Sequence, residues 1–111
     1  MSELLHITER TLWESARAAG TYTWSTRGRT LQEEGFIHCS FPHQLRGVAE
    51  LLYGAAPAPG ELVVLVIDPA LLDVPVRVEE VSPGGPRFPH IYGPLPVVAV
   101  TEVRDWPHPD A

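Results

Sequence analysis

Apolar residues recur at helical spacing in two stretches of the first half of the chain, and both stretches predict amphipathic helices. The first runs over Glu9–Ala19, where Thr8 is placed to cap the helix and Gly20 to end it. The second runs over Pro42–Tyr53, with proline in the first turn. The apolar stripes consist of Leu12, Trp13, Ala16 and Ala19 in the first helix and Leu45, Val48, Ala49 and Leu52 in the second.

Extended patterns occupy much of the remaining sequence. Glu61–Ile67 is apolar on both faces, which predicts a central strand covered on both sides. Thr26–Glu33 is polar and contains glycine, so it predicts a loop. Gly54–Gly60 predicts a surface loop between the two halves of the chain. Further strands are expected over Glu3–Ile7, Tyr22–Ser25, Phe36–Ser40, Val76–Val81 and Pro96–Arg104.

Proline is distributed unevenly along the chain. Of the twelve prolines, only Pro42 lies in the first half of the 111 residues. Proline disrupts helices but is accepted in turns and at strand edges, so the helices belong in the first half and the strands in the second. The sequence therefore predicts one α+β domain over residues 1–111, with two helices, a core over about 3–104 and a tail over 105–111.

Charge and cysteine usage exclude several classes of protein. The net charge is −6, and all eight basic residues are arginines, which disfavours binding to nucleic acid or to an anionic membrane. The longest apolar run is too short to cross a bilayer, and the amino-terminal residues lack the basic region of a signal peptide. Cys39 is the single cysteine, so no internal disulfide forms and a cytoplasmic location is expected.

Two of the expected strands carry a histidine and a hydroxyl on one face. Side chains alternate along a strand, so His6 points with Thr8, and His38 points with Ser40. If these strands are neighbours, the four side chains line one cleft. A structural interpretation is also open, in which Thr8 and Ser40 cap the following helices and the histidines only satisfy hydrogen bonds.

A third chemical segment is FPHIYGPLP, which contains His90 and Tyr92 and is too irregular in sequence for a regular strand. His90 is a candidate site residue because loops carry function, whereas Tyr92 has the alternative of filling the core. Glu79 is a candidate general base or hydroxyl acceptor, since it alternates with Arg77 near a strand end.

Other chemistries fit the sequence less well. Cys39 is adjacent to His38 on a strand, so the two point to opposite faces and form no nucleophilic dyad. A zinc ion held by His6, His38 and His90 is sterically conceivable, but no local pair of ligands supports it, and we expect no metal. Glycine-rich phosphate-binding loops before a helix are absent from the sequence.

The segments LLHIT, EGFIHCS, the Asp-Pro after the central strand and FPHIYGPLP resemble domain-of-unknown-function family 952, over about Leu4–Val103. More distantly, His6-Ile7-Thr8 and His38-Cys39-Ser40 are similar to the His-x-Thr and His-x-Ser motifs of ADP-ribosyltransferases, in particular RNA 2′-phosphotransferases. This resemblance implies a bent, split, mainly antiparallel sheet and a bound NAD.

By that resemblance, His6, His38 and His90 are candidate catalytic residues of ADP-ribosyl or phosphoryl-type transfer. The chain departs from the family pattern where the transferases place a catalytic acid, since it offers His90 and Tyr92 there. A second hypothesis is that the protein is a non-catalytic module that binds or senses a nucleotide. A third is that it is a structural domain without a site. The ligand contacts expected for NAD or ADP-ribose are Thr8, Ser40, Tyr92, Glu79 and Arg87, with Arg27 and Arg29 as further phosphate partners.

Overall fold

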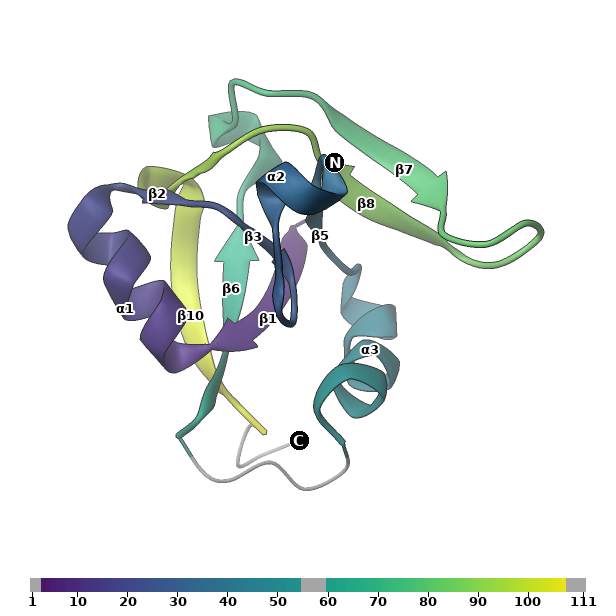
Figure 1. Cartoon of the computed structure of the whole chain (residues 1–111), viewed down its shortest axis with the longest axis horizontal. Coiled ribbons are helices and arrows are strands. Elements are labelled where there is room, and N and C mark those ends of the chain that lie inside the picture. The colour runs from purple at the N-terminus through teal and green to yellow at the C-terminus, as the bar shows by residue number, and fades with distance from the viewer. Residues whose placement is uncertain (1–2, 55–59, 108–111) are drawn as a thin grey trace.

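The computed structural model, which describes residues 3–54 and 60–107, has two three-stranded antiparallel sheets with helices packed beside them (Figure 1). The α+β class predicted from the proline distribution is confirmed. The expected loop over Gly54–Gly60 and the expected tail over 105–111 fall partly outside the described residues. No helix in the described ranges is long and apolar enough to cross a membrane.

The first sheet has the strand order β1-β6-β10 and forms the centre of the core. It comprises β1 (Leu4–Glu9), β6 (Leu62–Ile67) and β10 (Val100–Trp106), with β6 antiparallel to both neighbours. All six residues of β6 are buried, and its alternate side chains enter two different apolar clusters. The prediction of a central strand covered on both faces is therefore confirmed.

Two helices cover this sheet on opposite sides (Figure 1). Helix α1 (Arg10–Ala19) buries Trp13 and Ala16 in the larger cluster and ends at Gly20, which has φ 90° and lies in the left-handed region, as its sequence predicts. Helix α3 (Leu45–Tyr53) follows a 3₁₀ turn, η1 (Pro42–Gln44), and packs its apolar stripe on the other face of the sheet.

The second sheet has the order β5-β8-β7, formed by β5 (Ile37–His38), β8 (Arg87–Ile91) and β7 (Val76–Glu80). The expectation that FPHIYGPLP is too irregular for a strand was wrong, because its first part forms the middle strand of this sheet. Pro89 fits there because its carbonyl accepts a hydrogen bond from the Cys39 amide at 3.0 Å, and the donor that it lacks would also face Cys39, just after the end of β5.

The segment between α1 and β5 differs from the sequence-based expectation. It contains β2 (Thr21–Tyr22), which pairs with β9 (Leu95–Pro96), and a hairpin of β3 (Trp24–Thr26) and β4 (Arg29–Thr30). A third helix, α2 (Leu31–Glu34), follows where a loop was expected, so the prediction of two helices was wrong. Thr30 and Glu33 form a reciprocal capping box that stabilises this short helix.

One backbone bridge joins the two sheets. Leu5 of β1 and Ser40, just after β5, exchange two hydrogen bonds of 2.8 and 2.7 Å. The His-x-Thr and His-x-Ser strands are therefore neighbours, as the cleft hypothesis required. Residues 60–107, which begin just before β6, contain no α-helix. Their helical turns are the 3₁₀ turns η2 (Pro69–Leu71) and η3 (Val97–Ala99).

Candidate functional site

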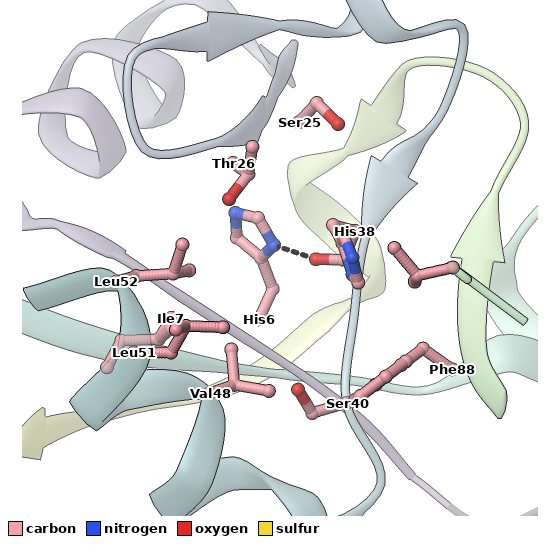
Figure 2. A pocket seen from close by; sticks show the side chains of 11 residues that line it. His6, Ile7, Ser25, Thr26, His38, Ser40, Val48, Leu51, Leu52 and Phe88 are labelled. Atoms are coloured by element: carbon pink, nitrogen blue, oxygen red, sulfur yellow. Dashed lines mark hydrogen bonds between the residues drawn. The ribbon is translucent and has the colours of Figure 1, made fainter. Parts of the chain in front are cut away.

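A pocket of about 120 Å³ lies beside the bridge between the two sheets (Figure 2). Its floor carries imidazole and hydroxyl groups, and its walls are aliphatic and aromatic side chains from α3, β8 and the end of β7. Residues from six separate segments meet here, namely His6, Ile7, Ser25, Thr26, His38, Ser40, Val48, Leu51, Leu52, Val81 and Phe88. The lining residues include no acidic side chain and no arginine.

His6 forms part of this floor, but both of its ring nitrogens are already engaged. Nδ1 lies 2.6 Å from the His38 carbonyl oxygen, and Nε2 lies 2.7 Å from the Tyr22 hydroxyl, which is also hydrogen-bonded to Thr8 at 2.8 Å. The side chain is 2% exposed. Burial lowers the pKa of His6 to about 4, so the ring is neutral near pH 7.

The neutral state fixes the hydrogen positions on His6. A carbonyl only accepts hydrogen bonds, so Nδ1–H donates to His38, and Nε2 accepts from Tyr22. Because both nitrogens are used, His6 is a positioning residue that ties β1 to the backbone of β5. Its side chain is inside the molecule, contrary to the expectation of a polar strand face open to a ligand.

Thr8 does not cap the first helix. It belongs to β1, is buried, and contacts Tyr22, whereas the residue that precedes α1 is Glu9 and makes no side-chain cap. Burial raises the pKa of the Tyr22 phenol, which keeps its hydroxyl protonated for His6. Thr8 is absent from the lining of the pocket, so only His6, His38 and Ser40 of the four expected side chains lie there.

His38 is the histidine that the pocket leaves accessible. It is half-buried, and the ring faces the cavity in Figure 2, close to Phe88 at a centroid distance of 5.5 Å. Burial, and secondarily the neighbouring His90, lower the pKa of His38. A neutral imidazole at this position can accept a proton or a hydrogen bond from a ligand.

His90 lies directly opposite His38 in the β5–β8 pairing, with the ring centroids 4.8 Å apart, but it is not among the residues that line the pocket. Phe36 stacks on its ring at 4.0 Å and 17°, so the side chain is only 2% exposed. His90 Nδ1 donates to Glu79 at 2.9 Å, while its Nε2 is buried without a hydrogen-bond partner in the described part of the chain.

The Glu79 carboxylate accepts hydrogen bonds from two of the predicted site residues, His90 and Tyr92. Besides His90, it accepts a hydrogen bond of 2.5 Å from the Tyr92 hydroxyl, and the Arg77 guanidinium lies 4.8 Å from the centre of the Tyr92 ring. The bond from Tyr92, and then that from His90, lower the pKa of Glu79, and this carboxylate raises the pKa of Tyr92. The Tyr92 side chain is half-exposed beside the sheet, so it does not fill the core.

Ser25 was missed by the sequence analysis. This residue lines the pocket, and its hydroxyl is fully buried, with no hydrogen-bond partner among the described residues. A buried polar group without a partner is rare in folded proteins, and one beside a cavity is a candidate for contact with a ligand. A lone serine in a short polar stretch gives no signal in sequence, because only the β3–β4 hairpin turns it toward β5.

The three arginines expected to bind phosphate differ in availability. Arg27 donates to the Leu52 carbonyl at 2.5 Å and lies over the Tyr53 ring, and Arg29 pairs with Glu34 at 2.9 Å. Arg87 is exposed, precedes Phe88 of the pocket wall, and has no side-chain partner in the ranges that the structure describes. Of these three arginines, only Arg87 has no side-chain partner in the described ranges, and as the neighbour of Phe88 on β8 it points away from the pocket wall.

Cys39 points into the larger apolar cluster, as the strand alternation predicts. Its burial raises the pKa of the thiol, which makes it a poor nucleophile. Within the described residues, no group of three or more histidine, cysteine, aspartate or glutamate side chains is arranged to hold a metal ion. In the zinc alternative His6 would be a ligand, but both of its ring nitrogens already form hydrogen bonds within the protein.

Comparison with known proteins identifies the family. The chain is similar to protein CC0527 from Caulobacter crescentus: its crystal structure has 33% identity and a TM-score of 0.75, with 94% of this chain and 85% of that chain covered. The solution NMR structure of the same protein matches at 34% identity with a TM-score of 0.68, covering 95% and 84% of the two chains. No curated protein matches. The model of the family described as "Protein of unknown function (DUF952)" matches residues 7–103, and the chain therefore belongs to this family.

Proposed function

We propose that the pocket binds one ring-sized group of a nucleotide, with NAD and ADP-ribose as the ligands to test first. The observation that carries this proposal is Ser25, a residue of the pocket lining whose buried hydroxyl has no partner in the described chain. A ligand with a polar edge supplies the missing hydrogen bond, and its apolar faces fit between the pocket walls.

The size of the pocket supports a ring-sized group. At about 120 Å³ it is close to cavities that hold a single benzene ring, on the order of 150 Å³, and below the roughly 300 Å³ at which drug-sized pockets begin. Phe88 and Leu51 offer flat and aliphatic surfaces, and Ser25, His38 and Ser40 are polar residues of the same lining. The sugar and phosphates of a nucleotide would therefore lie outside the mouth.

The charges around the mouth agree with this orientation. No arginine lines the pocket, so a diphosphate inside it would meet no compensating charge. Arg87 precedes Phe88 on β8, so its side chain points to the face of the strand opposite to the pocket wall and offers no charge to a group inside the cavity. The similarity of the two His-x-hydroxyl motifs to those of ADP-ribosyltransferases supports the same class of ligand.

A catalytic form of this proposal has one observation in its favour. His38 is neutral, faces the pocket, and is backed by His90, which Glu79 orients. In an ADP-ribosyl transfer, the bond from the ribose to nicotinamide breaks, the acceptor oxygen bonds to the ribose, and His38 would take the acceptor's proton. No carboxylate lines the pocket, so binding without transfer is the form that the geometry supports better.

Thermal unfolding in the presence of NAD or ADP-ribose tests the proposal. A ligand at a hundred times its dissociation constant stabilises the folded state by about 2.7 kcal/mol, a shift on the order of ten degrees for a domain of this length. Substitution of Ser25 by alanine should raise the melting temperature of the free protein slightly, since it removes an unsatisfied buried hydroxyl, and should reduce the ligand-induced shift.

Ser82→Ala is the matched control, because Ser82 is exposed and lies outside the pocket. It should leave both melting temperatures unchanged. His38→Ala should abolish the ligand-induced shift. The proposal fails if neither ligand shifts the transition at millimolar concentration, or if Ser25→Ala and His38→Ala leave an observed shift intact.

A further inference from the structure

The outer strand of the second sheet, β7, has an open edge. It pairs with β8 over five consecutive residues, from Val76 opposite Ile91 to Glu80 opposite Arg87, without a bulge. On its other side it pairs with no strand of the described chain, and Figure 1 shows it at the upper right margin of the molecule. Such an edge presents N–H and C=O groups that another strand can bond.

The position of Pro89 shows which way the backbone of β8 points. The Pro89 carbonyl accepts the hydrogen bond from Cys39, so this residue faces β5. Successive residues of an antiparallel strand face opposite neighbours, and His90 therefore faces β7. The hydrogen bond of 2.8 Å from the Tyr92 amide to the Pro75 carbonyl follows the same alternation.

The alternation extends to β7 through its register with β8. Arg77 and Glu79 lie opposite residues that face β7, so their backbone groups point inward to β8. Val76, Val78 and Glu80 therefore direct their N–H and C=O groups to the open edge. Val78 is also 42% exposed, although it is apolar.

We infer that a second copy of this chain pairs with this edge, antiparallel and about a twofold axis at Val78, so that the two three-stranded sheets become one. In this register Arg77 of each copy stands opposite Glu79 of the other. Val78 stands opposite itself, and Val76 stands opposite Glu80. A twofold pairing of one strand with its own copy is self-complementary only if opposite charges meet, which the order Arg-Val-Glu provides.

Charge selects this register over its neighbours. An axis at Arg77 would place two arginines opposite each other, and an axis at Glu79 would place two glutamates opposite each other. With the axis at Val78, the outward-facing residues exchange the backbone hydrogen bonds. The Arg77–Glu79 pairs then fall at the positions without such bonds, where opposite side chains come closest.

The side chains of Glu79 and Arg77 are both available for an ion pair with the second copy. The hydrogen bonds from His90 and Tyr92 to Glu79 both end on Oε1, and Oε2 makes none within the described chain. Arg77 lies over the Tyr92 ring and forms no ion pair with a described residue. The inference rests on the backbone and on these charges, and it is independent of the ligand proposed for the pocket.

Sedimentation equilibrium of the full chain from micromolar to millimolar concentration tests the inference. We expect a monomer–dimer equilibrium that weakens at high salt, because exposed ion pairs are screened. Arg77→Glu should raise the dissociation constant about tenfold, and the double variant with Glu79→Arg should restore it. Arg17→Glu changes the charge equally on exposed α1 and should have no effect.

Val78→Pro tests the backbone contact directly. Proline removes an N–H that points to the open edge and leaves the inward bonds to β8 in place, so the variant should stay folded and monomeric. Amide hydrogen exchange gives a measurement without substitution. The amides of Val78 and Glu80 should become protected as concentration rises, whereas those of Arg77 and Glu79 should be protected throughout.

Three results would overturn the inference. The first is a monomer up to millimolar concentration, and the second is a dimer that Val78→Pro does not weaken. The third is exchange at Val78 and Glu80 that does not depend on protein concentration. If the swapped double variant fails to fold, the exchange measurement on the unaltered chain still decides the question.

Discussion

Acid should destabilise this fold through His6. The ring is buried and neutral in the folded state, with a pKa lowered to about 4, whereas a histidine in the unfolded chain has a pKa of about 6.5. Between these values the unfolded state binds more protons than the folded state. The contribution of His6 to stability is therefore complete above about pH 6.5 and is lost progressively as the pH falls toward 4.

The size of this effect follows from the two pKa values. Each pKa unit is worth about 1.36 kcal/mol, so the difference between about 6.5 and about 4 amounts to on the order of 3 kcal/mol of unfolding free energy. About 2.5 kcal/mol of this should be lost between roughly pH 7.5 and pH 4.5. A domain of this size has a total stability of about 5–15 kcal/mol, so the loss is a large part of it.

Urea unfolding across this pH range, on the unaltered chain and on His6→Gln, measures the contribution. Glutamine hydrogen-bonds but does not titrate, so the variant should be less stable near neutral pH and its stability should fall less steeply with acid. His43→Gln, at an exposed histidine, should retain the steep profile. If the His6→Gln profile is as steep as that of the unaltered chain, the buried neutral imidazole is not the source of the acid sensitivity.

Three further predictions concern single positions. Cys39 should react with a thiol reagent only after unfolding, and labelling of the folded protein would contradict its place in the core. Gly93→Ala should cost about 1–3 kcal/mol in denaturant unfolding, because a Cβ there would lie 2.5 Å from a methyl carbon of Val74; an unchanged midpoint would show that the contact relaxes freely. Thr30→Ala should cost about 1 kcal/mol by removing the capping box with Glu33, and an unchanged stability would mean that the box contributes nothing.

The parts of the fold that depend on local pattern were predictable from the sequence. The apolar run that forms β6, the stop at Gly20 and the inward orientation of Cys39 each follow from a periodicity or a conformational preference of a few residues. The pairing of the two histidine strands was a conditional prediction, and the bridge from Leu5 to Ser40 confirms their adjacency.

The errors arise where tertiary contacts override local signals. Pro89 suggested an irregular segment, but a proline fits the middle strand when its missing donor would face the point where the neighbouring strand ends. The Thr-x-x-Glu motif at Thr30 was visible, yet the polar composition of the segment favoured a loop. Alternation placed His6 and Thr8 on one face correctly, but it could not show that Tyr22 covers that face.

One backbone bridge joins the two sheets in the described chain, and the candidate pocket lies across the junction between them. Residues of β1 line one part of the pocket, and residues of β5 and β8 line another. A ligand that touches His38 and Ile7 at once would add a contact between the two sheets to those made by the bridge and by the apolar cluster that they share. Ligand binding should therefore slow the sub-global opening of the whole β5-β8-β7 sheet, well beyond the residues that the ligand contacts.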